Sequence, residues 1–192
     1  YQETSSAVTG QAMSLDPHLR PDQYLRTVQD IDFQALAERG IRHFCFDLDN
    51  TLVPQFSSTI VPEAKAAIQQ ARAKGYIEKI ALISNVLIWG PRTRRLARLA
   101  QELDIENVYP GLIWRKKPGP KPFLWALKVM GVPGEKICMV GDQIYSDILG
   151  GNRFGFHTIL VQQLGGDHWT TKITGRRERE IQVLKELGLE PQ

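Results

Sequence analysis

Apolar residues along the chain follow two patterns, short continuous runs and longer stretches with a helical period. The runs are rich in β-branched and aromatic residues and have the length of buried strands. The longer stretches repeat apolar residues at i, i+3, i+4 and i+7, which is the spacing of one helix face. The predicted strands cover residues 41–46, 79–84, 107–109, 137–141 and 156–161.

Stretches of helical period separate these predicted strands. The first of them begins at Pro62 and stops before Gly75, the two residues that typically mark a helix start and a helix end. Residues 21–40 are predicted to form short helical pieces, with Asp32 as an N-cap and Gly40 as a stop. The predicted helices cover residues 62–74, 96–103, 123–130, 144–149 and 176–187.

The alternation of strands and helices predicts an α/β fold with a doubly wound, mostly parallel, Rossmann-like sheet of five strands and helices on both faces. We expect one domain over residues 16–192, preceded by a polar, flexible tail over residues 1–15. Only 32 residues separate Thr51 from Ser84, and 32 separate Ser84 from Lys117. A helix and a strand already fill each gap, so no cap domain is expected.

The charge of the chain is informative in its distribution. The net charge of +3 is too small to indicate a nucleic-acid partner, but residues 92–121 carry eight basic side chains against three acidic ones. Such a local excess favours an anionic substrate or an anionic lipid surface, although a solvated helix face would show it too. The basic residues are Arg92, Arg94, Arg95, Arg98, Arg115, Lys116, Lys117 and Lys121.

The chain carries no apolar run of the roughly 18 residues that a membrane span needs, and no signal segment opens it. We therefore expect a cytoplasmic protein whose membrane contact, where it occurs, is peripheral. Cys45 and Cys138 both fall in predicted buried strands, so they are interpreted as reduced core residues.

Two of the predicted strands end in acidic residues. Asp47 and Asp49 follow the first strand one residue apart, so they leave it on the same face. Asp142 follows the fourth strand, and Asp147 comes five residues later. Because open α/β sheets bind ligands at the carboxyl ends of their strands, these residues are expected to meet. Together they predict a site that holds Mg²⁺ and transfers phosphoryl groups.

Residues at or after the ends of several predicted strands offer the groups that phosphoryl transfer requires. Asp47 is the candidate nucleophile, and Asp49 could protonate the leaving oxygen and later deprotonate water. Ser84 and Asn85 could donate hydrogen bonds to phosphoryl oxygens, and Lys117 could offset negative charge.

Four further residues concern the metal and the edge of the predicted site. Asp142 would complete an oxygen site for Mg²⁺, and Asp147 is either a water-mediated ligand or a partner of Lys117. Trp89 and Trp114 flank the second and third motifs. They either pack under loops or form, with the arginines, a rim suited to lipid headgroups.

These residues, in this order, resemble the four motifs of the haloacid dehalogenase (HAD) superfamily of phosphohydrolases. The resemblance implies that Asp47 is the nucleophile and Asp49 the acid/base, and the presence of Asp49 favours a phosphatase over a dehalogenase. It also implies a metal site made by Asp47, the Asp49 carbonyl and Asp142. The implied phosphate-binding residues are Asn50, Thr51, Ser84, Asn85 and Lys117. The motifs themselves read Asp47-Leu48-Asp49-Asn50-Thr51-Leu52-Val53, Ser84-Asn85, Lys117-Pro118 and Gly141-Asp142-Gln143 through Asp147.

A narrower resemblance, to the YqeG-type phosphatases of subfamily IIIA, covers residues 19–161. It is carried by the Leu-x-Pro-x-x-Tyr pattern at residues 19–24, the first acidic motif, Gly141-Asp142-Gln143 and residues 147–161. This group is related to the phosphatidylglycerophosphate phosphatases of mitochondria and plastids, so the resemblance implies an anionic phospholipid substrate and, in a eukaryote, one of these organelles. Residues 86–91 depart from the polar sequence usual in relatives.

The leading functional hypothesis is a Mg²⁺-dependent phosphatase that converts phosphatidylglycerophosphate to phosphatidylglycerol. A site without a cap suits a substrate that is shielded by a bilayer or a macromolecule. The alternatives are a protein or nucleic-acid phosphatase, a phosphatase of soluble metabolites, a phospho-acceptor like a response regulator, and a non-catalytic scaffold. The presence of both Asp47 and Asp49 argues against the scaffold, and their position on one strand end argues against the phospho-acceptor. The oligomeric state is not indicated.

Overall fold

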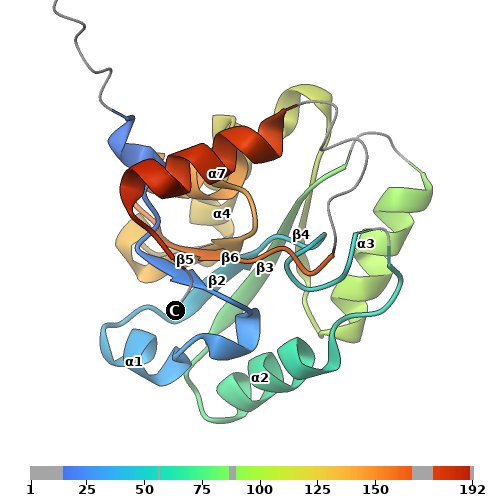
Figure 1. The fold of residues 1–192 in the computed structure, drawn as a ribbon. Helices are drawn as coiled ribbons and strands as arrows, with labels where there is room; N and C mark the ends of the chain where they lie inside the picture. Colours follow the sequence, from blue (N-terminus) through green and yellow to red (C-terminus); the bar gives the residue numbers. More distant parts are fainter. Residues whose placement is uncertain (1–14, 56, 87–89, 166–174, 191–192) are drawn as a thin grey trace, which may run out of the picture.

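The computed structural model describes residues 15–55, 57–86, 90–165 and 175–190. Trp89 and all of the predicted tail except Leu15 therefore lie outside the described residues. A six-stranded sheet with the order β1-β6-β5-β2-β3-β4 forms the centre of the molecule (Figure 1), and every neighbouring pair is parallel. The predicted α/β class with a doubly wound sheet is confirmed. The strands are β1 (Gln23–Leu25), β2 (His43–Phe46), β3 (Lys79–Asn85), β4 (Asn107–Gly111), β5 (Ile137–Gly141) and β6 (His157–Val161).

The sheet has one strand more than the five that were predicted. The additional strand is β1, within residues 21–40, for which only short helical pieces were predicted, and it pairs with residues 159–161 of β6. Three residues are too few to show a period of two, and this strand forms because the edge of β6 offers unpaired backbone groups. The helical pieces expected nearby follow it as η2 (Val28–Asp30) and α1 (Phe33–Glu38), and Asp32 caps α1 as predicted.

Helices cover both faces of the sheet because its central strands are apolar on both sides. Along β2, Phe44 and Phe46 point into one core cluster while Cys45 points into another, as expected for a strand buried on both faces. The helices α1, α2 (Pro62–Ala73) and α3 (Pro91–Glu102) pack on the first face. The helices α4 (Pro120–Met130), α5 (Leu149–Arg153) and α7 (Arg176–Leu187) contribute to the clusters on the second. Cys45 and Cys138 are buried free thiols, in agreement with the prediction.

The connection after β5 differs from the regular helix predicted for residues 144–149. A π-helical turn, η5 (Ile144–Ile148), comes first and runs directly into α5. This turn brings Asp147 back against Gly141, where an added Cβ atom would collide with the Asp147 carboxyl group. Glycine at position 141 therefore allows the close approach of Asp147 to the end of β5.

Two absences hold for the described residues. Between β2 and β3, and between β3 and β4, the structure describes α2 and α3 but no inserted cap domain. No described helix combines the length and the apolar composition that crossing a bilayer requires.

Candidate active site

The carboxyl ends of β2, β3 and β5 surround a cavity of about 360 Å³, and most of the predicted site residues line it. Asp142 and Asp147 lie next to this cavity, with carboxyl oxygens within 4.8 Å of an Asp47 oxygen. The fold thus brings together the acidic strand ends, as expected from the parallel sheet. The lining residues are Asp47, Asp49, Asn50, Gln55, Ser84, Asn85, Arg92, Lys117, Gln143 and Ser146.

Lys117 forms two buried ion pairs with the carboxylates of this site. Its Nζ atom lies 2.7 Å from Asp47 Oδ1 and 2.6 Å from Asp147 Oδ1. Burial alone would lower the pKa of Lys117, but Asp147 and Asp47 outweigh it and raise the pKa above its ordinary value. Burial raises the pKa of Asp47 to about 7, against the opposing effect of Lys117 and with a further contribution from Asp147. Lys117 therefore stays charged and is held beside the candidate nucleophile.

Asn85 holds the backbone of Lys117 in place. The Lys117 amide donates to Asn85 Oδ1 at 2.8 Å, and Asn85 Nδ2 donates to the Lys117 carbonyl at 3.1 Å. The same Nδ2 atom lies 3.2 Å from Ser146 Oγ. In this structure the Asn85 amide is thus engaged with protein groups, which ties β3 to the loop that carries Lys117. Its neighbour Ser84 is buried and lines the cavity.

Asp47, Asp142 and Asp147 form a buried carboxylate cluster. Asp142 Oδ2 accepts a hydrogen bond from Gln163 Nε2 at 2.9 Å, whereas its Oδ1 is buried and has no hydrogen-bond partner among the described residues. Burial, then Asp47 and Asp147, raise the pKa of Asp142 well above its usual range. Burying three carboxylates together costs free energy unless protons or a cation neutralise them, and the Asp142 oxygen without a hydrogen-bond partner in the described part of the chain adds to this cost. The all-oxygen donor set therefore fits a hard divalent cation.

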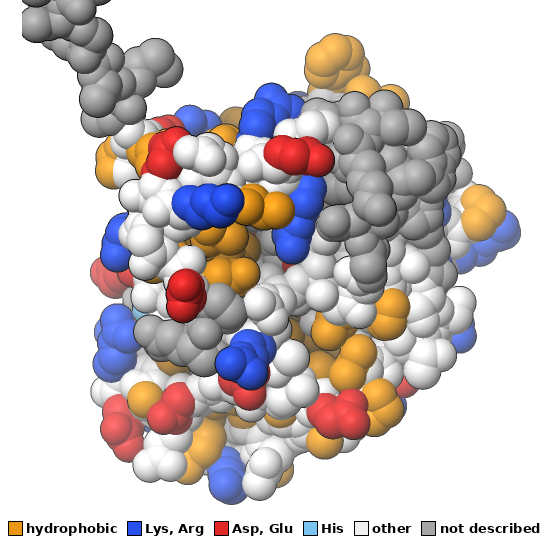
Figure 2. Space-filling model, in the orientation of Figure 1, with side chains coloured by type: hydrophobic (Ala, Val, Ile, Leu, Met, Phe, Trp, Pro, Cys, Tyr) orange, Lys and Arg blue, Asp and Glu red, His pale blue; other side chains and the backbone are white. Residues whose placement is uncertain are grey.

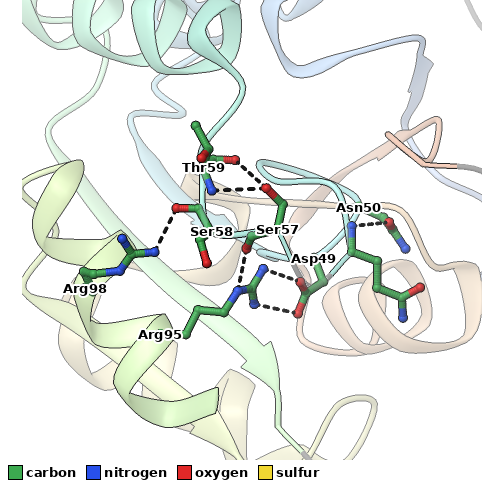
Figure 3. Close-up of polar contacts among 8 residues, drawn as sticks. Asp49, Asn50, Ser57, Ser58, Thr59, Arg95 and Arg98 are labelled. Carbon is green, nitrogen blue, oxygen red and sulfur yellow. Dashed lines mark hydrogen bonds and ion pairs between the residues drawn. The ribbon is translucent and has the colours of Figure 1, made fainter. Parts of the chain in front are cut away.

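The Asp49 side chain points toward α3, where it meets Arg95 (Figure 3). The next two residues complete the turn after β2. Asn50 has a left-handed backbone with a φ of 62°, and its Oδ1 accepts from the Gln55 amide at 3.1 Å. The Thr51 hydroxyl is buried and has no hydrogen-bond partner among the described residues. This turn places Asn50 and Gln55 at the wall of the cavity, next to the two aspartates.

Three contributors to this site were not assigned a role from the sequence. Arg95 pairs with Asp49, Gln163 donates to Asp142, and Ser146 contacts Asn85. The only signal for Arg95 was the basic run on α3, and nothing local marked the other two. All three depend on contacts between distant segments.

The match to known proteins agrees with this geometry. A family model described as HAD-hydrolase-like matches residues 114–186. The Bacillus subtilis protein named "Probable phosphatase YqeG" is 31% identical over 170 residues, which are 88% of this chain and 92% of that protein. The chain belongs to the YqeG-like group of HAD hydrolases. It is therefore a phosphatase of the HAD superfamily, and its buried aspartates are consistent with a HAD metal site.

Other relatives of this HAD phosphatase are longer or more distant. The chloroplastic and mitochondrial phosphatidylglycerophosphate phosphatase 1 of Arabidopsis thaliana is 28% identical over 174 residues. The match covers 89% of this chain but 49% of the plant protein, so the chain spans about half of that relative. A crystal structure of an uncharacterised Listeria monocytogenes protein has a TM-score of 0.52 at 22% identity and covers 67% of this chain and 84% of its own. That similarity shows the shared fold.

Proposed function

We propose that this HAD phosphatase is a Mg²⁺-dependent phosphomonoesterase that works through an aspartyl-phosphate and acts on phosphatidylglycerophosphate. The observation that carries the chemistry is the position of Asp47, held by Lys117 and next to Asp142 and Asp147 at the end of an open cavity. The substrate is supported by the plant relative, whose name specifies phosphatidylglycerophosphate.

The first step forms the covalent intermediate. A carboxylate oxygen of Asp47 attacks phosphorus while the bond from phosphorus to the leaving oxygen breaks, and Asp49 donates a proton to that oxygen. Lys117 offsets charge on Asp47 and on the phosphoryl group. Mg²⁺, held by Asp47, the Asp49 carbonyl and Asp142, would supply further positive charge at the phosphoryl oxygens when bound.

The second step restores the enzyme. Asp49, now deprotonated, accepts a proton from water, whose oxygen attacks phosphorus and breaks the bond to Asp47. Inorganic phosphate leaves, and both carboxyl groups return to their starting protonation. In this scheme, Ser84, Asn50 and Thr51 bind phosphoryl oxygens, and Asn85 acts through the backbone of Lys117.

A lipid substrate suits the surroundings of the cavity. No described segment covers the site as a cap would, and the exposed Arg92 lines its wall. Enzymes without a lid gain shielding from water when the substrate itself brings an apolar environment. The basic side chains on α3 would attract the anionic surface of a membrane that contains the substrate.

Phosphate release from phosphatidylglycerophosphate in mixed micelles, compared with soluble phosphomonoesters, tests this proposal. We expect Mg²⁺-dependent release with a preference for the lipid, and no release by Asp47→Asn. Equal or faster turnover of the soluble esters would remove the lipid substrate but keep the phosphatase. A stable phosphoprotein without turnover would instead indicate a phospho-acceptor.

A further inference from the structure

The two most exposed large apolar side chains of the described residues are adjacent to each other. They belong to the short turn η3 (Ile113–Arg115), where Trp114 is 90% exposed and Ile113 is 60% exposed. We propose that this turn docks the enzyme on an anionic lipid bilayer, with Ile113 and Trp114 in the interface and Arg115 and Lys116 at the headgroups. The inference deepens the proposed function, and its lipid source rests on the lipid substrate proposed above.

The turn is anchored at both ends, so its exposure reflects a defined position. Before the turn, the Gly111 carbonyl accepts from the Val86 amide at 3.0 Å at the end of β4. After it, Asn85 holds the backbone of Lys117 by two hydrogen bonds. Ile113 itself has a φ of 29°, a positive value that residues other than glycine rarely adopt. Such a conformation is retained only where the surrounding structure demands it.

The composition of the turn matches a membrane interface. Arg115 and Lys116 are exposed next to the two apolar residues. Tryptophan places its apolar ring and its N–H group at the boundary between headgroups and hydrocarbon, and basic residues are attracted by anionic lipids. Ile113 has no ring to stack on a nucleic-acid base and no polar group to bind one. A bilayer therefore accommodates all four side chains, which a nucleic acid does not.

The turn also has a fixed relation to the catalytic cavity. In Figure 1 it stands at the upper edge of the molecule, beyond the carboxyl end of β4, and Figure 2 shows an apolar projection at that edge. Lys117, which binds Asp47, follows the turn by two residues. Docking through this turn would bring the mouth of the cavity to the membrane surface, where the phosphomonoester of a lipid is presented.

Sedimentation of the full chain with vesicles tests the proposal without requiring turnover. The vesicles contain phosphatidylcholine alone or phosphatidylcholine with phosphatidylglycerol. We expect binding to the anionic vesicles, with a loss of about tenfold or more in partitioning for the double variant Ile113→Ala and Trp114→Ala. Arg115→Gln with Lys116→Gln should weaken binding to anionic vesicles only. Leu124→Ala, at a residue of α4 that is 54% exposed, is the matched control and should bind as the wild type does.

Activity measurements separate docking from the chemistry. The double variant should hydrolyse a soluble phosphomonoester at the wild-type rate and show a raised KM for substrate embedded in vesicles. Unchanged vesicle binding by the double variant would overturn the docking proposal. Binding of the wild type to a nucleic-acid homopolymer, lost in the variant while vesicles are not bound, would overturn it in favour of a nucleic-acid surface. Absence of phosphatase activity in the wild type would count against the proposed function alone. The docking proposal is decided by vesicle binding, which is measured independently of turnover.

Discussion

The Asp49 carboxylate and the Arg95 guanidinium form a two-point ion pair, with Nη2 2.8 Å from Oδ1 and Nη1 3.3 Å from Oδ2. Arg95 Nε also donates to the Ser57 carbonyl at 2.6 Å, so helix α3 fixes both the carboxylate and the loop that follows it (Figure 3). The pair is partly buried, with side-chain exposures of 16% for Arg95 and 29% for Asp49. Arg95 is thus placed to orient the acid/base that the proposed mechanism assigns to Asp49.

Arg95→Ala should lower kcat/KM for an alkyl phosphomonoester by about 10- to 100-fold, the usual range for a misplaced acid/base. The loss in kcat/KM, which reports formation of the aspartyl-phosphate and not its hydrolysis, should be much smaller for 4-nitrophenyl phosphate, whose leaving group departs without a proton. Steady-state kinetics with both esters provides the measurement.

Arg98→Ala is the matched control for this prediction. Arg98 lies on the same helix and donates to the Ser58 carbonyl at 2.8 Å, so it tethers the same loop. In Figure 3 the Arg98 guanidinium reaches Ser58, whereas that of Arg95 reaches Asp49. Equal losses for the two variants, or equal losses with the two esters, would show that Arg95 only supports the loop.

Removal of Lys117 should destabilise the fold and abolish activity. In Lys117→Met, Asp47 and Asp147 lose the cation that lies between them, and breaking a buried ion pair on one side typically costs about 3–5 kcal/mol. Urea unfolding measures the change in the free energy of unfolding. Lys116→Met, at the exposed neighbouring position, should leave it unchanged. A stability loss below about 1 kcal/mol for Lys117→Met would contradict the buried network.

Stability without metal should fall as the pH rises. The folded state raises the pKa of Asp47 from 3.8 to about 7 and raises that of Asp142 as well, in both cases chiefly through burial. The folded state therefore binds these protons more tightly than the unfolded state, and the free energy of unfolding decreases between the unfolded and folded pKa values. In EDTA, the Tm should decrease as the pH is raised from about 5 to about 8.

Mg²⁺ should counteract this drop, because a cation at the cluster stabilises the deprotonated carboxylates. The increase in Tm on adding Mg²⁺ should be larger at pH 8 than at pH 5. Asp142→Asn should flatten the pH dependence in EDTA and reduce the response to Mg²⁺. A Tm that does not respond to Mg²⁺ at either pH would argue against a metal at these carboxylates.

Gly141→Ala should reduce both stability and activity. The new Cβ atom would collide with the Asp147 carboxyl group, so the group that pairs with Lys117 has to shift. Overpacking of this kind typically costs about 1–3 kcal/mol. Thermal unfolding and phosphatase kinetics measure the two effects. Gly165→Ala is the control, because its Cβ atom would lie in ordinary contact at 3.6 Å from Asn50 Oδ1. A wild-type Tm for Gly141→Ala would refute the predicted collision.

The sequence by itself determined the five predicted strands, most of the helices and the positions of the acidic motifs. Local patterns carry this information, since burial on both faces makes β2 and β5 continuous apolar runs and the residues that follow them are then at strand ends. The parallel sheet brings those ends together, so the sequence alone predicts that Asp47, Asp142 and Lys117 meet.

Tertiary structure alone decided β1, the partner of Asp49 and the exposure of Trp114. The three residues of β1 form a strand only because β6 offers them an edge. Asp49 and Arg95 are 46 residues apart, and their pairing depends on how α3 packs beside the turn after β2. The composition near Trp114 allowed either a packed or an exposed ring, and anchors at Gly111 and Lys117 place it outside. Such contacts join distant segments, so their energies appear only when the chain is folded and have no periodic trace in the sequence.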